Sequence, residues 1–219
     1  MCFSSSASFG ISAVLLVGGI ATYKQTKNIS QVPFAMIPFI FSIQQFCEGL
    51  LWLSLTKPEF AGFERGSTYI FLILAQGLWP LWVPYSIYKI EENPDRKKVL
   101  KLFLISGLIV SVYLMYSLTI YPAKASISTF HIQYDLARPH SNIFTGVFYF
   151  IATIIPPFIS SIKKMMIISL FGLASFLITI LFYPEHIISI WCFFAAGISI
   201  GVILVLRKKT FSLNSYKPI

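Results

Sequence analysis

The chain has 219 residues, of which 56% are hydrophobic and 11% charged, and its formal net charge is +9. This composition excludes an ordinary soluble domain, because only lipid can solvate so much apolar surface. The charge does not indicate nucleic-acid binding, because the basic residues lie in short clusters between apolar runs and form no single basic face. The sequence therefore predicts an all-α integral membrane protein whose partner is the lipid bilayer, and the expected location is the bacterial inner membrane.

Seven apolar runs recur along the chain and are suited, as helices, to crossing about 30 Å of hydrocarbon. They are 8–23, 33–55, 67–89, 99–121, 142–161, 165–183 and 187–206. The first run has no Lys or Arg ahead of it, so it is kept as a span and not taken for a cleavable signal peptide. We expect one transmembrane domain over 1–219, a seven-helix bundle with a tight turn before the last span.

The basic residues predict the orientation of this bundle, because Lys and Arg near span ends stay on the cytoplasmic side. With the N-terminus outside and the C-terminus in the cytoplasm, 13 of the 17 basic residues lie inside. The four that remain outside are Lys57, Arg65, Lys124 and Arg138. A reversed start or an even number of spans would scatter the clusters to both faces.

A weak internal repeat accompanies this topology. Spans one to three and five to seven share an orientation, with span four as the inverting connector, and Ile20-Ala21-Thr22 corresponds to Ile151-Ala152-Thr153. Such a three, one, three arrangement resembles the topology of SWEET and PQ-loop sugar or amino-acid transporters, although the Pro-Gln signature is absent. The resemblance implies a solute transporter built from two repeats.

Glu48 is the acidic residue that falls within a predicted span, where a charged group costs at least a few kcal/mol. Helical spacing places it on one face with Gln44, Gln45 and Trp52. We expect this face to form a polar layer in the outer half of the bundle. The other expected members, at or near the same level, are Gln76, Tyr149, Tyr113 and Tyr116.

Two interpretations of this layer remain open. Interhelical hydrogen bonding alone explains glutamines and tyrosines in a span, and each such contact contributes about 1 kcal/mol or less. For Glu48 we favour a functional role, because a buried carboxyl group can act as a proton carrier, a general base or a ligand.

Histidines form a second candidate site on the expected outer side. His131, Asp135 and His140 lie in the longest loop, and His186 lies in the last outer turn. Three imidazoles plus water make a hydrolytic zinc site, so we expect His131, His140 and His186 as zinc ligands with Asp135 or Glu48 as the base. The spacing matches no zinc motif, and solvated surface histidines are the alternative.

Cys2 also falls on the expected outer side. It could serve as a soft metal ligand, a nucleophile or a disulfide partner of Cys47, and an inert small residue at a helix entrance is the default interpretation. Proximity decides between these roles, and sequence does not give it.

Several short segments over roughly the first quarter of the chain belong together: Met1-Cys2-Phe3-Ser4, Ala7-Ser8-Phe9, Pro33-Phe34-Ala35, Pro38, Gln44-Gln45, Glu48-Gly49 and Trp52. In these segments the chain resembles an uncharacterised family of small multi-pass membrane proteins. The resemblance implies a membrane protein and directs attention to Cys2, Gln45, Glu48 and Trp52. The chain is also similar in topology to alkaline ceramidase-like membrane hydrolases, which have seven helices and a His-bound zinc, but it lacks their paired histidine motif on the last helix.

Two functions follow as hypotheses. The first is a metal-dependent hydrolase of a lipid or small amphiphile with the histidines as ligands. The second is a solute transporter in which two three-helix repeats move about the Glu48 and Gln76 layer. A membrane sensor or scaffold is a third possibility, and the oligomeric state is not predicted.

Overall fold

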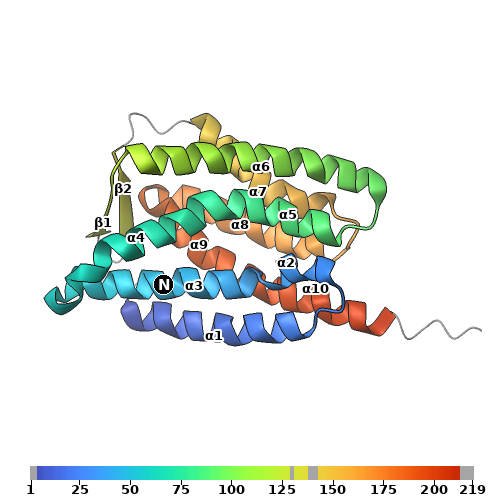
Figure 1. Ribbon diagram of the computed structural model, residues 1–219, viewed down its shortest axis with the longest axis horizontal. Coiled ribbons are helices and arrows are strands. Elements are labelled where there is room, and N and C mark those ends of the chain that lie inside the picture. Colours follow the sequence, from blue (N-terminus) through green and yellow to red (C-terminus); the bar gives the residue numbers. More distant parts are fainter. Residues whose placement is uncertain (1–3, 129–130, 138–142, 213–219) are drawn as a thin grey trace, which may run out of the picture.

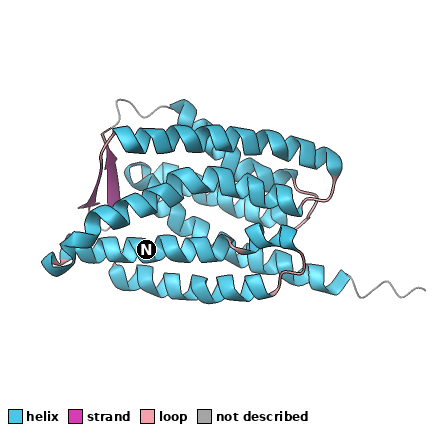
Figure 2. Ribbon diagram, in the orientation of Figure 1, coloured by secondary structure: helices cyan, strands magenta, loops and turns pink. Residues whose placement is uncertain are grey.

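The computed structural model describes residues 4–128, 131–137 and 143–212, and it is mostly helical (Figure 2). Among these residues, six helical segments are long and apolar enough to cross a membrane, and a further apolar helix, Phe144–Ile159, is shorter. The six are Ser5–Lys24, Ile29–Thr56, Pro58–Ile90, Pro94–Ile120, Met165–Phe182 and Pro184–Leu206. The chain is therefore an integral membrane protein, as its composition predicted.

The long helices lie side by side along a common axis (Figure 1). In chain order the helical elements are α1 (Ser5–Lys24), η1 (Ile29–Gln31), α2 (Val32–Ala35), α3 (Ile37–Thr56), η2 (Pro58–Phe63), α4 (Glu64–Leu72), η3 (Ile73–Leu78), α5 (Trp79–Ile90), α6 (Pro94–Ile120), α7 (Ile143–Ile159), α8 (Met165–Phe182), η4 (Pro184–His186), α9 (Ile187–Ala196) and α10 (Ile198–Ser212). The expected spans 33–55, 67–89 and 187–206 are thus each divided into shorter helices.

The expectation of a purely α-helical chain is incomplete, because the segment after α6 forms a β-hairpin. Its strands are β1 (Ala123–Ser128) and β2 (His131–Leu136), which pair antiparallel with Ala123 opposite Leu136. In β2 every second residue is apolar, so one face packs on the bundle, where Ile132 is fully buried and Tyr134 stacks on Phe71 with ring centroids 4.8 Å apart. The hairpin covers the end of the bundle where α1 begins (Figure 1), which we call the hairpin end.

Helices α1 and α3 pack closely because small residues face each other. A Cβ atom on Gly19 would lie 2.8 Å from the backbone nitrogen of Phe39, so only glycine permits this approach. The hydroxyl groups of Ser12 and Ser42 each donate to the other residue's carbonyl oxygen at 2.8 Å. Close backbone contact and interhelical hydrogen bonds drive helix association where lipid leaves no hydrophobic gain.

The third span is irregular at the level of the candidate site, because η3 is a π-helical segment. The backbone N–H of Trp79 bonds to the Leu74 carbonyl oxygen, which leaves the Ala75 oxygen for another donor. The Tyr149 hydroxyl donates to that oxygen at 2.5 Å, and the Ser111 hydroxyl donates to the Gly77 oxygen at 2.6 Å. Side chains of neighbouring helices thus satisfy the backbone where the helix is disturbed.

Proline also determines how α6 packs on α5. Pro84 has no N–H, so the Pro80 carbonyl oxygen has no helical partner and protrudes towards α6. Gly107 faces this oxygen, and a Cβ atom there would lie 1.9 Å from it. The packing of α6 against α5 therefore depends on a glycine at this position.

Glu91 joins two loops at the end of the bundle opposite the hairpin. Its carboxylate is 2% exposed and accepts hydrogen bonds from the Ser161 N–H at 2.7 Å, the Ser161 hydroxyl at 2.6 Å and the Ser160 hydroxyl at 3.0 Å. It also accepts from the backbone N–H groups of Glu92 and Asn93. Burial raises the pKa of this carboxyl group, but the hydrogen bonds from Ser161, Asn93 and Ser160 outweigh burial and bring the pKa below its usual value.

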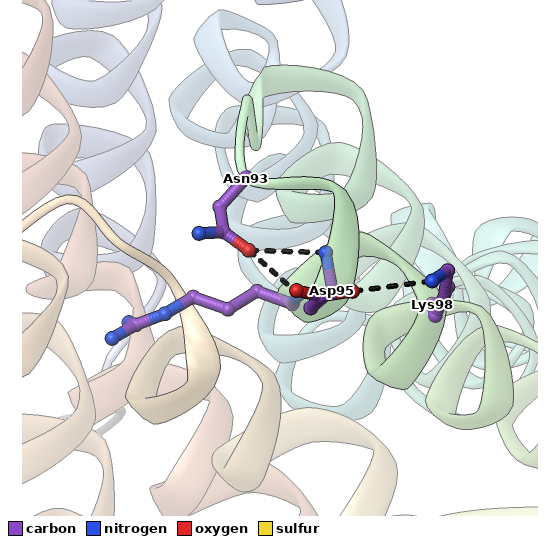
Figure 3. Close-up of polar contacts among 4 residues, drawn as sticks. Asn93, Asp95 and Lys98 are labelled. Carbon is purple, nitrogen blue, oxygen red and sulfur yellow. Dashed lines mark hydrogen bonds and ion pairs between the residues drawn. The ribbon is translucent and has the colours of Figure 1, made fainter.

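The same loop begins α6 with a cap. The Asn93 side chain accepts from the backbone N–H groups of Asp95 and Arg96 at 3.0 Å, and Asp95 pairs with Lys98 at 3.1 Å (Figure 3). Arg96 donates to the Ser160 carbonyl oxygen at 2.7 Å. These contacts and those of Glu91 hold the α5–α6 loop against the α7–α8 loop. Sequence analysis did not identify Glu91, because it lies just outside the apolar run.

Candidate functional site

Glu48 on α3 is fully buried in the bundle and is hydrogen-bonded to a residue of its own helix and to a residue of α9. The Gln45 amide donates to its Oε2 at 3.1 Å, and the Ser189 hydroxyl on α9 donates to its Oε1 at 2.5 Å. The Ser189 distance is typical of a hydroxyl bound to a carboxylate. Glu48 therefore faces the interior, as the helical spacing predicted, and it joins α3 to α9.

Further polar groups surround this carboxylate. The Trp79 indole N–H donates to the Gln44 amide oxygen at 2.7 Å, and its ring stacks on Phe41 with centroids 4.0 Å apart. Cys192, one turn after Ser189 on α9, is buried beside Glu48 and Gln44. We call Gln44, Gln45, Glu48, Trp79, Ser189 and Cys192 the Glu48 cluster.

The other residues expected in the polar layer differ in where they lie. Gln76 is buried in η3, and Tyr149 reaches the same segment from α7 through its bond to Ala75. Trp52 is buried in an apolar cluster one turn from Glu48 towards the hairpin end. Tyr113 and Tyr116 are exposed on α6 and lie outside the layer, so their expected place was wrong. Cys2 lies outside the described residues.

A cavity of about 900 Å³ lies beside the Glu48 cluster. Its walls come from η3, α6, α7, α8, α9 and β2, and most of its lining residues are apolar. Cys192 of the cluster and its neighbours Gln76 and Tyr149 supply the polar lining away from the hairpin. Pockets of 300–1,000 Å³ with an apolar lining and a few polar groups are typical of small-molecule sites.

Aromatic rings form much of the cavity wall. Trp191 lies at 65° to Tyr149, with centroids 5.6 Å apart, and at 66° to Phe176, with centroids 5.1 Å apart. Phe176 in turn lies 4.6 Å from Phe150. The Trp191 indole N–H is buried and has no hydrogen-bond acceptor among the residues that the structure describes. These rings meet at steep angles and form a corner rather than a stack.

A second, smaller cavity of about 60 Å³ continues towards the opposite end of the bundle. It shares Tyr149, Trp191 and Cys192 with the large cavity, so these three side chains separate the two spaces. Its other lining residues are almost all apolar, and Gly172 keeps part of the space open because a Cβ atom there would lie 3.1 Å from Ile154.

Two of the three expected histidine ligands lie together at the hairpin end. The rings of His131 and His186 stack with centroids 5.0 Å apart, and Tyr183 lies 5.4 Å from His131. Burial, and then the nearby His186, lower the pKa of His131, which favours the neutral imidazole that binds metals. His140 lies outside the described residues.

The expected bases do not accompany these histidines. Asp135 is exposed, accepts a bond from Gln133, and lies about 13 Å along β2 from His131. Glu48 bonds Ser189, which lies three residues after His186 and deeper in the bundle. Within residues 4–128, 131–137 and 143–212, no three His, Cys, Asp or Glu side chains are placed to hold a metal ion.

The fold and the Glu48 cluster define a helical membrane protein with a buried carboxylate beside an apolar cavity. The chain belongs to the Family of unknown function (DUF6629), whose model matches residues 1–216. This agrees with the resemblance seen at the start of the sequence and extends it over nearly the whole chain. No curated protein and no solved structure matches the chain.

Proposed function

We propose that the chain crosses the membrane seven times, with its N-terminus and the hairpin outside and its C-terminus in the cytoplasm. Helix α7 has 17 residues and would span about 26 Å, which suffices with slight thinning of the bilayer. Figure 1 has the start of α1 and the hairpin at one end, and at the other the loop before α6, which leads directly into the first turns of α6 with Arg96, Lys97 and Lys98. The positive-inside rule then assigns that loop to the cytoplasm.

Cysteine labelling tests this orientation. Ser126→Cys in β1 and Asn28→Cys near the opposite end both replace exposed polar residues, and each is combined with Cys2→Ser so that the introduced thiol alone can react on the surface, because Cys47 and Cys192 are buried. A membrane-impermeant maleimide applied to intact cells should label the first variant and should label the second only after permeabilisation. The reverse pattern would overturn the orientation and the outward-facing cavity with it.

On this topology, the protein is a transporter that takes up a small amphiphile through the large cavity. The cavity carries the proposal: about 900 Å³ of mostly apolar space whose polar wall is formed by Cys192 of the Glu48 cluster together with Gln76 and Tyr149. The apolar walls suit an aliphatic or aromatic portion, and the polar wall suits a head group.

The backbone beside the cavity favours transport over simple binding. Transporter sites commonly lie at breaks in membrane helices, where the freed backbone groups face the ligand. Here η3 is π-helical at Gln76, and α7 carries Pro156 and Pro157 below Tyr149. At the opposite end, Glu91 and Arg96 hold the loops together with Ser160 and Ser161, which suits a state closed on that side.

A matched pair of variants tests the cavity. Ile180 lines it and Ile178, on the same helix, does not, although the two are 41% and 42% exposed. Ile180→Trp should abolish specific binding of tritiated dodecanol to the protein in nanodiscs, measured above protein-free nanodiscs, and Ile178→Trp should bind like the wild type. Equal binding by both variants would refute the proposed site.

Uptake into proteoliposomes tests the transport step. A buried carboxyl group that can carry a proton should couple uptake to a pH gradient. The quantity measured is the part of amphiphile uptake that excess dodecanol inhibits. In Glu48→Gln this uptake should no longer respond to the pH gradient. Unchanged, gradient-driven uptake by this variant would exclude the coupling role.

A zinc-dependent hydrolase is the second candidate, and the stacked pair of His131 and His186 favours it. His140 would supply the third ligand, and the zinc-bound water would attack an ester or amide of an amphiphile. Elemental analysis of the purified protein should then show one zinc per chain, lost on His131→Ala. Absence of stoichiometric metal from wild-type protein purified without chelators would eliminate this candidate.

A further inference from the structure

Tyr149, Phe176 and Trp191, which we call the aromatic corner, lie on the same side of the large cavity as the buried carboxylate of Glu48. Trp191 and Tyr149 line the cavity next to Cys192, and Ser189, one turn earlier on the same helix as Trp191 and Cys192, donates a hydrogen bond to Glu48 behind this wall. We infer that the head group of the ligand is an organic cation, an ammonium or quaternary ammonium group, held by these rings at the wall of the cavity behind which the Glu48 carboxylate is buried. This inference rests on the proposed function, because it specifies the ligand of the same cavity.

The rings supply the first part of the recognition. An ammonium group is attracted to the negative face of Trp, Tyr or Phe within about 6 Å of the ring centroid, and several rings around one cation form an aromatic cage. Trp191 makes edge-to-face contacts with Tyr149 and Phe176 at centroid distances of 5.6 and 5.1 Å, and all three rings line the cavity. Phe150, whose ring centroid lies 4.6 Å from that of Phe176, adds a further ring to the lining.

The charges supply the second part. None of the lining residues that the structure describes is Lys, Arg, His, Asp or Glu, so no charged group competes with the ligand inside the cavity. Behind the aromatic wall of the cavity lies the carboxylate of Glu48, whose oxygens accept hydrogen bonds from Gln45 and from Ser189 of α9, the helix that carries Trp191. An anionic head group would meet repulsion from this carboxylate, and a neutral one would gain nothing from it, whereas a cation gains from both the carboxylate and the rings.

The geometry also explains why the rest of the cavity is apolar. A single chain attached to the head group would run from the aromatic corner along Phe176, Ile180 and Ile187 towards Leu136 of the hairpin. The ligand class is therefore a single-chain amphiphile with a cationic head, such as an alkyl ammonium or a choline ester.

Three probes with the same chain and different head charge test this inference. Dodecanoylcholine is the cation, 3,3-dimethylbutyl dodecanoate is its neutral isostere with carbon in place of nitrogen, and 2-sulfonatoethyl dodecanoate is the anion. Each probe is titrated into nanodiscs of neutral lipid that contain the protein with bound tritiated dodecanol, and the displaced dodecanol is measured. Probe concentrations are expressed per lipid. Dodecanol held by the lipid alone is measured in protein-free nanodiscs and subtracted. The cation should displace dodecanol at least tenfold more effectively than the isostere, and the anion should be the weakest.

Two variants test which residues cause the preference for the cation. Glu48→Gln keeps the shape of the side chain and should reduce the preference for the cation to about threefold or less, while the neutral isostere competes as before. Trp191→Leu should also reduce the preference for the cation. It provides the test of the site if Glu48→Gln does not fold. Phe46→Leu, on the lipid-facing side of α3, is the control and should keep the full preference.

The outcomes separate this inference from the proposed function. If the choline ester and its isostere compete equally with wild-type protein, the cationic head group is refuted and the amphiphile cavity stands. If Glu48→Gln and Trp191→Leu both retain the full preference, the assigned residues are refuted. If dodecanol does not bind the wild type above protein-free nanodiscs, the proposed function itself fails.

Discussion

Replacing Glu91 by Gln should strongly destabilise the protein without touching any apolar contact. Oε2 accepts from the Ser160 hydroxyl and the Ser161 N–H, and Oε1 accepts from the Ser161 hydroxyl and two further backbone N–H groups. Whichever oxygen becomes the amide nitrogen, at least one backbone N–H loses its acceptor, because a hydroxyl can rotate to accept but an N–H cannot.

The magnitude follows from those bonds. A buried N–H left without an acceptor costs about 1–3 kcal/mol, and the remaining bonds lose the strength that the charge gave them. We expect a loss of about 2–3 kcal/mol in the free energy of unfolding. Equilibrium unfolding in dodecyl maltoside and sodium dodecyl sulfate mixtures, followed by tryptophan fluorescence, measures it. The neighbouring exposed residue provides the control, and Glu92→Gln should change stability by less than about 0.5 kcal/mol.

The pH dependence of stability provides a second readout of the same carboxylate. Because the folded protein lowers the pKa of Glu91 below its usual 4.5, the unfolded chain binds more protons in that range. The contribution is fully present above pH 4.5 and is lost as the pH falls through the lower value in the folded protein. Glu91→Gln should lack this loss. The reasoning fails if the variant matches Glu92→Gln at neutral pH, or if both variants lose stability in acid as steeply as the wild type.

Two more substitutions test the packing around the site. Gly107→Ala would place a methyl group 1.9 Å from the Pro80 carbonyl oxygen of α5. We therefore expect a loss of more than about 3 kcal/mol in the free energy of unfolding, measured in the same assay. The control is Gly66→Ala, whose methyl group meets open space and should be neutral or slightly stabilising. Tyr149→Phe leaves the Ala75 carbonyl oxygen without its hydroxyl donor and should lower the free energy of unfolding by about 1–3 kcal/mol. Its control, Tyr116→Phe on the exposed face of α6, should not change stability. Equal effects of the two substitutions, in the glycine pair or in the tyrosine pair, would contradict the packing described.

The membrane-spanning segments and the inward direction of Glu48 were predictable from the sequence. Both follow from strong local signals: long apolar runs, and a carboxylate on a helix where lipid exposure would be prohibitive. The face shared by Gln44, Gln45 and Glu48 follows from helical spacing, which the backbone of α3 obeys.

The partners of Glu48 were not predictable, because Ser189 and Cys192 lie more than 140 residues away along the chain. A serine within an apolar helix is common and carries no signal of its partner. Only the packing of α9 against α3 brings the hydroxyl to the carboxylate.

The hairpin was missed although a local signal for it exists. Apolar Ile132, Tyr134 and Leu136 alternate with polar residues, the period of a half-buried strand. The prediction for this segment rested on His131 and His140 as metal ligands, and the alternation did not enter it. Tyr113 and Tyr116 were misplaced for another reason: depth in the membrane was counted along the helix, and the direction of each side chain around it was not.

The place of the ligand is the central claim, and a crystal structure with a brominated amphiphile tests it most directly. Dodecanoylcholine carrying bromine on its terminal carbon, with data collected at the bromine edge, should give an anomalous peak inside the large cavity near Leu136, with the head group density between Trp191 and Tyr149. Anomalous peaks confined to the lipid-facing surfaces of α1 and α6, with no density in the cavity, would contradict it.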